Sequence, residues 1–182
     1  MRFILPFLAL ACTACNPAGN PPDPAKGEAA APTGTAAPVA LADGALNAGG
    51  ISIAGAKGDI QVAFGTARAA AEVALVPLLG EPKSRDHNDE CGAGPMDFSH
   101  YGTLTLNFQD DKFVGWSANG APWLPGETRG DLAAQVKMQD DSTLGEEFVM
   151  GEGNAIVSGL FDGEGAGAKV TDLWAGTGCI FR

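Results

Sequence analysis

The sequence is poor in basic residues, and this limits the partners that the protein can bind. It has 11 Lys and Arg against 22 Asp and Glu, which gives a formal net charge of −11. A chain this acidic is repelled by phosphate backbones, and it has no basic stripe interleaved with aromatic residues. We therefore expect no nucleic-acid partner. The excess of carboxylates favours solubility, and it also suits a basic partner or a loosely held divalent cation.

The apolar run at the N-terminus, from Phe3 to Ala11, is too short to cross a membrane, which takes about 20 apolar residues. Arg2 precedes the run, and small residues and cysteine follow it, which is the layout of a secretory signal peptide. The segment also resembles a lipoprotein signal, which is cut before a cysteine that carries diacylglycerol. Ordinary secretion is one alternative. A buried N-terminal helix is another, but Pro6 argues against it.

Two cysteines compete for the lipid. We favour Cys15, with residues 1–14 as the signal peptide, because Cys12 leaves a shorter apolar run. Asn16 follows Cys15, so the aspartate that retains enteric lipoproteins in the inner membrane is missing. These features predict a protein that faces the periplasm and is held by its acyl chains in a lipid membrane, the outer one rather than the inner. Two acyl chains on one residue suffice for stable anchoring.

Motifs of common enzyme classes are also missing. The chain has no Gly-x-Gly-x-x-Gly after a strand, no phosphate loop, no Gly-x-Ser-x-Gly and no His-Glu-x-x-His. A dehydrogenase would need a nicotinamide-binding βαβ domain and a reduced cysteine, and neither is indicated. The acidic run at 86–90, which includes His87, is expected to be a solvated loop, because adjacent residues on a loop do not converge on one ion. We expect no catalytic residue, no cofactor and no metal site.

Residues after the anchor are mainly Pro, Ala, Gly, Thr and Asn, a composition typical of a solvated tether. We assign residues 15–45 to a disordered tether and residues 46–182 to one folded domain, whose two units cover about 46–121 and 122–182. The stretch 41–60 is transitional, because it is rich in glycine but contains Leu46, Ile51 and Ile53.

Two cysteines remain after the anchor, Cys91 and Cys179. An even number of cysteines in an exported protein most often forms disulfides, so we expect these two to be bonded. The alternative is a reactive thiol beside His87 or His100, which would need a cysteine kept reduced.

A weak internal repeat organises the folded part. Gly-Thr-Ala-Arg at 65–68 and Gly-Glu-Thr-Arg at 126–129 each precede a segment with helical propensity. We predict helices at about 67–79 and 129–137. Val73, Val76 and Leu79 are expected to share a face of the first helix. Thr128 with Asp131 approximates a capping box for the second.

Each predicted helix is followed by strands. Residues 103–109 alternate apolar and polar side chains, and with 112–117 they form the clearest hairpin, in which Leu104, Leu106 and Phe108 share one side. A second, looser hairpin covers 155–161 and 169–174. Both returning strands end in tryptophan, at Trp116 and Trp174.

The helix-then-hairpin unit resembles that of the outer-membrane lipoproteins that assist barrel assembly (the BamE or SmpA/OmlA type). The motifs behind this resemblance are Gly-Thr-Ala-Arg at 65–68, Leu-Gly-Glu-Pro at 79–82 and the hairpin at 104–116. The β-lactamase-inhibitor proteins carry two such units in tandem. The resemblance implies an α+β fold, with one antiparallel sheet built from two units, helices on one of its faces and the other face free to meet a partner.

Two classes of function follow from these observations. The first is a non-enzymatic envelope lipoprotein that binds another envelope protein, as an assembly factor or an inhibitor. The second is an envelope protein that binds a small ligand or a cation through its acidic loop. A flat aromatic sheet face favours the first class, and a deep cleft with convergent polar groups favours the second.

Overall fold

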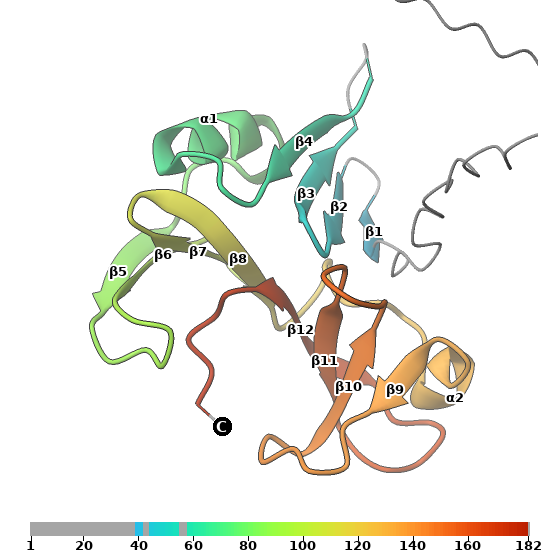
Figure 1. Cartoon of the computed structure of the whole chain (residues 1–182). Helices are drawn as coiled ribbons and strands as arrows, with labels where there is room; N and C mark the ends of the chain where they lie inside the picture. The colour runs from blue at the N-terminus through green and yellow to red at the C-terminus, as the bar shows by residue number, and fades with distance from the viewer. Residues whose placement is uncertain (1–38, 42–43, 55–57, 182) are drawn as a thin grey trace, which may run out of the picture. The chain divides into compact units, whose positions relative to one another are not determined.

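An eight-stranded antiparallel sheet forms the larger part of the structure (Figure 1). This computed structural model describes residues 39–41, 44–54 and 58–181. The strand order of the sheet is β5-β6-β7-β8-β12-β11-β10-β9. Its strands are β5 (Ser84–Asn88), β6 (Met96–His100), β7 (Leu104–Gln109), β8 (Lys112–Ala118), β9 (Val136–Met138), β10 (Glu146–Met150), β11 (Val157–Phe161) and β12 (Val170–Gly176).

A second, four-stranded antiparallel sheet precedes the large one in the chain. Its strands, in spatial order, are β1 (Val39–Leu41), β2 (Gly44–Asn47), β3 (Gly50–Ile53) and β4 (Ile60–Ala63). Regular structure therefore begins within the stretch 15–45 that was expected to be a tether. The stretch 41–60, which we interpreted as transitional, supplies apolar residues that stabilise this sheet: Leu46 and Ile51 are fully buried.

Both predicted helices start where expected, but only the first has the predicted length. Helix α1 (Arg68–Leu79) follows β4, and α2 (Arg129–Leu132) follows β8. The predicted capping box is present at α2, where the Thr128 and Asp131 side chains each accept a hydrogen bond from the other's backbone N–H. The segment expected to continue this helix to 137 instead contains β9, which pairs with β10.

The predicted class, an α+β fold with helices covering one face of the sheet, is wrong. The described chain is mostly antiparallel β-structure, with two helices beside twelve strands. The sequence pattern missed the four-stranded sheet, whose strands are only three or four residues long. This sheet, together with α1, covers the sheet face that helices alone were expected to cover.

The apolar face expected for α1 is also wrong. Val73 is 71 % exposed and Val76 is 37 % exposed, whereas Ala71 and Leu75 are fully buried. Residues four positions apart lie on the same side of a helix, so Ala71 and Leu75 form the contact face together. Val73 and Val76 face outward, because the side of α1 that contacts β4 and β8 is the side of Ala71 and Leu75.

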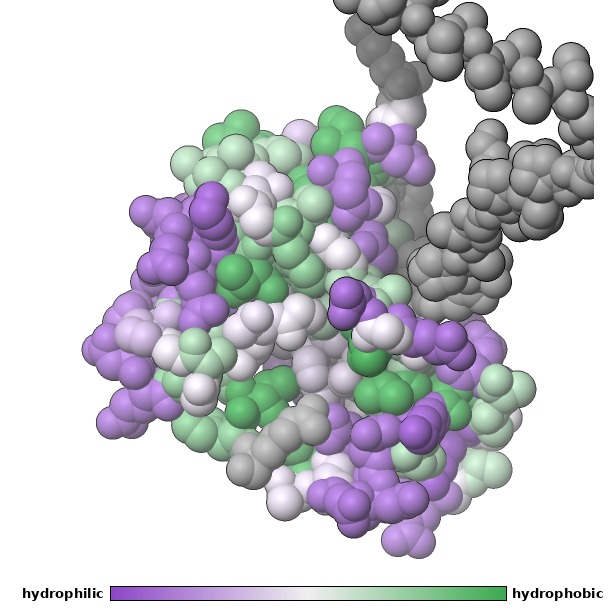
Figure 2. Space-filling view, viewed as in Figure 1, coloured by the Kyte–Doolittle hydropathy of each residue, from purple (hydrophilic) through white to green (hydrophobic). Residues whose placement is uncertain are grey.

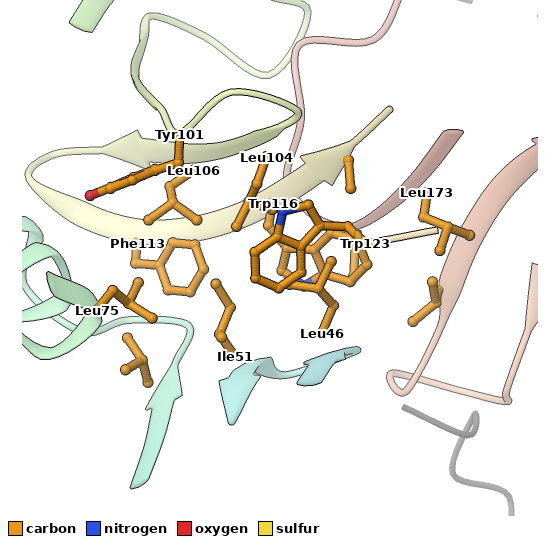
Figure 3. Packing of buried hydrophobic residues seen from close by; sticks show 14 of the residues in the cluster. Leu46, Ile51, Leu75, Tyr101, Leu104, Leu106, Phe113, Trp116, Trp123 and Leu173 are labelled. Carbon is orange, nitrogen blue, oxygen red and sulfur yellow. The ribbon is translucent and has the colours of Figure 1, made fainter. Parts of the chain in front are cut away.

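The main core lies between the small sheet and strands β7 and β8 of the large sheet (Figure 3). As predicted, Leu104, Leu106 and Phe108 share this buried side, and each is fully buried. Leu46 and Ile51 face them from the small sheet (Figure 3). Other side chains of the large sheet and α1 are also fully buried: Leu75, Phe113, Trp116, Phe148 and Leu173.

The predicted hairpin at 103–109 and 112–117 is confirmed by the pairing of β7 with β8. Asp110 and Asp111 form its turn, with φ angles of 49° and 56°. Two successive residues with positive φ match the right-handed twist of the strands, and aspartate tolerates this conformation better than most residues.

The large sheet has two halves of the same plan, each a helix followed by a four-stranded antiparallel meander. The halves join where β8 pairs with β12, and Ser117 lies opposite Trp174 at the centre. The pairs Ala118–Leu173 and Trp116–Ala175 flank this centre symmetrically. Equivalent bridges join Ala67 to Lys112 in one half and Thr128 to Lys169 in the other. The strand register at the junction is therefore consistent with a pseudo-twofold axis that passes through the Ser117–Trp174 pair and relates the two halves.

Candidate functional site

The side of the large sheet that faces away from the core is the candidate site, and we call it the open face. Side chains alternate along a strand, so residues between the core positions of β7, β8 and β12 point to this side. They include Thr105, Asn107, Ser117, Asp172 and Trp174. The pseudo-twofold centre of the sheet thus lies in the middle of the open face.

A groove of about 370 Å³ lies over the first half of the open face. His100 is its main polar group: Nδ1 lies 2.9 Å from Thr105 Oγ1, and Nε2 lies 3.2 Å from a carboxylate oxygen of Asp86. The ring of Phe98 stacks on that of His100, with 6.2 Å between their centroids. Polar groups in this groove are therefore largely engaged with one another.

A second groove, of about 230 Å³, lies over β8, β11 and β12. Leu144, Leu160 and Ile180 give it apolar walls, and Asp172 and Trp174 line it from β12. No hydrogen bond or ion pair joins the Asp172 carboxylate or the Trp174 indole N–H to any described residue. This groove therefore combines an aromatic ring, a carboxylate and apolar walls.

The C-terminal segment 177–181 crosses the open face between the two grooves, and we call it the strap. It is fixed at its start, where Thr177 N–H donates to Val114 O at 2.8 Å and the Asn107 amide donates to Thr177 O at 3.0 Å. A Cys91–Cys179 disulfide fixes its middle to the loop after β5, as the even cysteine count predicted. Ile180 lines both grooves, so the strap forms part of each.

Polar and apolar residues are segregated in the view of Figure 2. Hydrophobic residues gather in the middle, and hydrophilic ones lie toward the two sides, near β5 and near the loops around β10. Neither groove is lined by a described lysine or arginine. Described arginines instead form ion pairs elsewhere, Arg68 and Arg85 with Glu72 and Arg129 with Glu146. Among the described lining residues, the charged side chains are therefore those of Asp86 and Asp172.

A polar cluster around Glu72 lies on the other side of β6. Burial raises the pKa of Glu72, but hydrogen bonds from Arg85, Ser99 and Arg68 outweigh it, and the pKa falls to about 2. Such a carboxylate stays charged at neutral pH and is unsuited to proton transfer. Burial first, and then the negative charge of Glu72, raise the pKa of Tyr101 to about 12. These hydrogen bonds and ion pairs hold α1 against the sheet.

His87 lies on strand β5 and not on the solvated loop that we expected. The carboxylates of Asp89 and Asp97 accept hydrogen bonds from its ring nitrogens at 2.9 Å each, and they raise the pKa of His87 above the usual value. The sequence pattern missed the strand because its residues, Ser-Arg-Asp-His-Asn, are polar throughout. They are nonetheless compatible with an edge strand, where charged side chains discourage pairing with another chain.

The two histidines lie on opposite sides of the sheet. His87 pairs with Asp97 on the side of α1, whereas His100 meets Asp86 on the open face. Asp86 and His87 are neighbours on one strand, so their side chains point in opposite directions. The acidic run therefore does not gather both histidines around one point. Among the described residues, no group of three or more His, Cys, Asp and Glu side chains is placed to hold a metal ion.

The proposed lipidation sites, Cys15 and the alternative Cys12, lie outside the described residues. Within the described part of the chain, neither helix is long and apolar enough to cross a membrane. Comparisons of the sequence and the structure with protein-family models, curated proteins and solved structures give no match.

Trp174 is the residue whose role the sequence pattern missed. Trp116 and Trp174 both end returning strands, but the two side chains lie in different environments. The structure buries Trp116 fully, with Nε1–H donating to Asn47 O at 2.9 Å, and places Trp174 on the open face. The alternation of side chains along β12 indicates this position of Trp174. Leu173 and Ala175 on either side of it face the core, so Trp174 faces the other way.

Proposed function

We propose that this protein is a non-enzymatic lipoprotein of the cell envelope that binds another envelope protein through the open face. The observation that carries the proposal is Trp174, an aromatic side chain at the centre of a sheet face, without a hydrogen-bond partner in the described chain. Tryptophan is enriched among residues that dominate binding energy, especially near the centre of an interface.

The membrane anchor is supported by the N-terminal sequence alone. A short apolar run that ends at Cys15 predicts export and acylation, and the tether predicted after it would let the domain reach partners away from the lipid surface. An assembly factor or an inhibitor would have this arrangement, and the resemblance to the tandem-unit lipoproteins points the same way. The periplasmic face of the outer membrane is the location that we propose.

The form of the open face supports a protein partner. Open grooves on both sides of the strap present Phe98, Trp174 and the 64 % exposed Phe181. The disulfide and the hydrogen bonds of Thr177 hold the strap in place before a partner arrives. A surface that is ordered in advance loses less conformational entropy on binding.

Site-specific photocrosslinking in intact cells tests this proposal. A benzophenone side chain at Thr105, on the open face, is expected to give one discrete crosslinked protein. The same group at Val73, on the outward side of α1, serves as the control. Adding Trp174→Ala to the Thr105 probe is expected to reduce the crosslink several-fold, because the central anchor is lost.

Equal crosslinking from Thr105 and Val73, or a crosslink that Trp174→Ala does not change, would contradict the proposal. A small ligand remains the second candidate, because the volume of the first groove falls within the range of about 300–1,000 Å³ typical of ligand sites. Native mass spectrometry of protein isolated from the envelope distinguishes the two, since a ligand would appear as a constant added mass.

A further inference from the structure

Asp172 lies on the open face and has no partner among the described residues. Its side chain is half-buried on β12, and no described residue donates a hydrogen bond to it or forms an ion pair with it. By contrast, Glu72 and Glu146 are each paired with arginine. A partly buried carboxylate loses hydration, and a cation from outside the domain would compensate for that loss.

Trp174 lies two positions further along the same strand and on the same face as Asp172. Residues two apart on a strand are about 7 Å apart, so one bound group can meet both side chains. The indole ring is a favourable surface for a cation, and its N–H is not used within the described chain. Carboxylate and ring together favour a positively charged group.

The walls of the groove favour a particular kind of cation. Leu144, Leu160 and Ile180 are apolar and line a space of about 230 Å³, and no described lysine or arginine lines it. Lysine and arginine side chains carry their charge at the end of an apolar stem, which covers apolar surface while the charged head reaches a polar group. The groove therefore matches a long basic side chain better than a metal ion or a compact amine.

We propose that the second groove binds a lysine or arginine side chain of the partner protein, a step that rests on the proposed function. The apolar stem of this lysine or arginine lies against Leu160 and Ile180. Its charged head pairs with the Asp172 carboxylate beside the ring of Trp174. The partner is thus a protein that presents a basic residue to an acidic, aromatic slot. Because Ile180 belongs to the strap, the disulfide holds one wall of this slot.

The test adds four small probes to the full-length mature protein solubilised in detergent. The probes are the N-acetyl methylamides of lysine, arginine, norleucine and glutamate. The indole N–H signals in the ¹H–¹⁵N NMR spectrum distinguish Trp174 from the buried Trp116 and Trp123. The lysine or the arginine probe is expected to shift the Trp174 signal in a saturable way and to leave the other two unchanged. Norleucine, which keeps the stem and lacks the charge, is expected to bind about tenfold more weakly.

Asp172→Asn is expected to weaken binding of the cationic probes by about tenfold. Glu164→Gln is the matched control, because Glu164 is an exposed carboxylate outside the groove and the change in net charge is the same. The proposal is overturned if both substitutions weaken binding equally, if norleucine binds as well as lysine, or if no cationic probe shifts the Trp174 signal.

Failure of the slot and failure of the proposed function can be told apart. A Trp174-dependent crosslink from Thr105 that Asp172→Asn leaves unchanged would overturn the basic slot while the open face still binds a protein. Probe binding that depends on Asp172, without any crosslink at the open face, would leave the slot standing and contradict the proposed protein partner.

Discussion

At the scale of single residues, Glu72 shows how a buried charge joins a helix to a sheet. Its carboxylate accepts hydrogen bonds from Arg68 at 3.2 Å, Arg85 at 2.7 Å and Ser99 at 2.6 Å. The side chain is 15 % exposed, so these bonds are only partly screened by water. Removing the charge leaves two arginines without their common partner.

Glu72→Gln is expected to lower the free energy of unfolding by about 1–3 kcal/mol at pH 7, because hydrogen bonds to a charged group are lost. The pKa of Glu72 is about 2 in the folded state, below the usual value of 4.5. The Glu72 carboxylate therefore contributes fully to the free energy of unfolding above its pKa in the unfolded state. That contribution is lost as the pH falls through its pKa in the folded state. Urea unfolding at pH 7 and pH 3 measures both effects.

The difference between Glu72→Gln and the unmodified protein should shrink at pH 3 relative to pH 7. Glu164→Gln, at an exposed turn, is the control and should change the free energy of unfolding very little. A difference that grows on acidification would show that Glu72 is not held as a charged group.

At the scale of elements, strand β7 is the part of the fold most clearly encoded locally. Its alternating pattern predicts that Leu104, Leu106 and Phe108 share one side, and all three are fully buried. The partner on that side was not predictable from the strand itself. It is the small sheet together with α1, not helices alone.

Leu106→Ala is expected to lower the free energy of unfolding by about 2–5 kcal/mol, because a fully buried leucine leaves a cavity. Val73→Ala is the control on α1, where the side chain is 71 % exposed, and it should change stability by less than about 0.5 kcal/mol. Equilibrium unfolding in urea measures both. A small effect of Leu106→Ala would contradict the burial of this side chain in the core.

The strap is the second element whose behaviour can be predicted. The Cys91–Cys179 bond closes a loop of 88 residues, for which the chain-entropy model gives about 4–5 kcal/mol. Replacing both cysteines with serine is expected to lower stability by up to that amount. It should also weaken binding of the lysine probe, since Ile180 then forms a less ordered wall.

Ile180→Ala with the disulfide intact separates these two effects. It removes the wall and keeps the covalent link, so it should weaken probe binding with a much smaller loss of stability than the double cysteine variant. Equal probe binding by all three proteins would show that the strap takes no part in the slot.

At the scale of the whole molecule, the sequence predicts an anchored domain at the end of a tether. The mature protein is expected to begin with an acylated Cys15, because the apolar run and the small residues before it form a lipoprotein signal. Mass spectrometry of the N-terminal peptide measures this directly. Cys15→Ser is expected to release the protein from the membrane fraction, whereas Cys12→Ser is expected to leave it attached.

An intact Met1, or processing without acylation, would contradict the anchor. An acyl group on Cys12 would keep the anchor and contradict only the choice between the two cysteines. Neither result bears on the open face, because the grooves are formed by described residues far from this segment in the chain.

The sequence by itself determined the elements whose signals are local. The first helix followed from the helical propensity of 67–79, the β7–β8 hairpin from strict alternation around two aspartates, and the disulfide from an even cysteine count. The polar strand β5 and the glycine-rich small sheet escaped prediction. Their residues form strands only because neighbouring strands supply the hydrogen bonds.

Only the tertiary structure decided where the candidate site lies. The pairing of β8 with β12 sets Ser117 opposite Trp174 and brings the two halves into one sheet, a long-range register that no local pattern specifies. The same pairing sends Trp116 into the core and Trp174 to the open face, and the disulfide then lays Ile180 beside Asp172. The residues proposed to bind a partner come from separate segments, so their proximity depends on packing and not on sequence spacing.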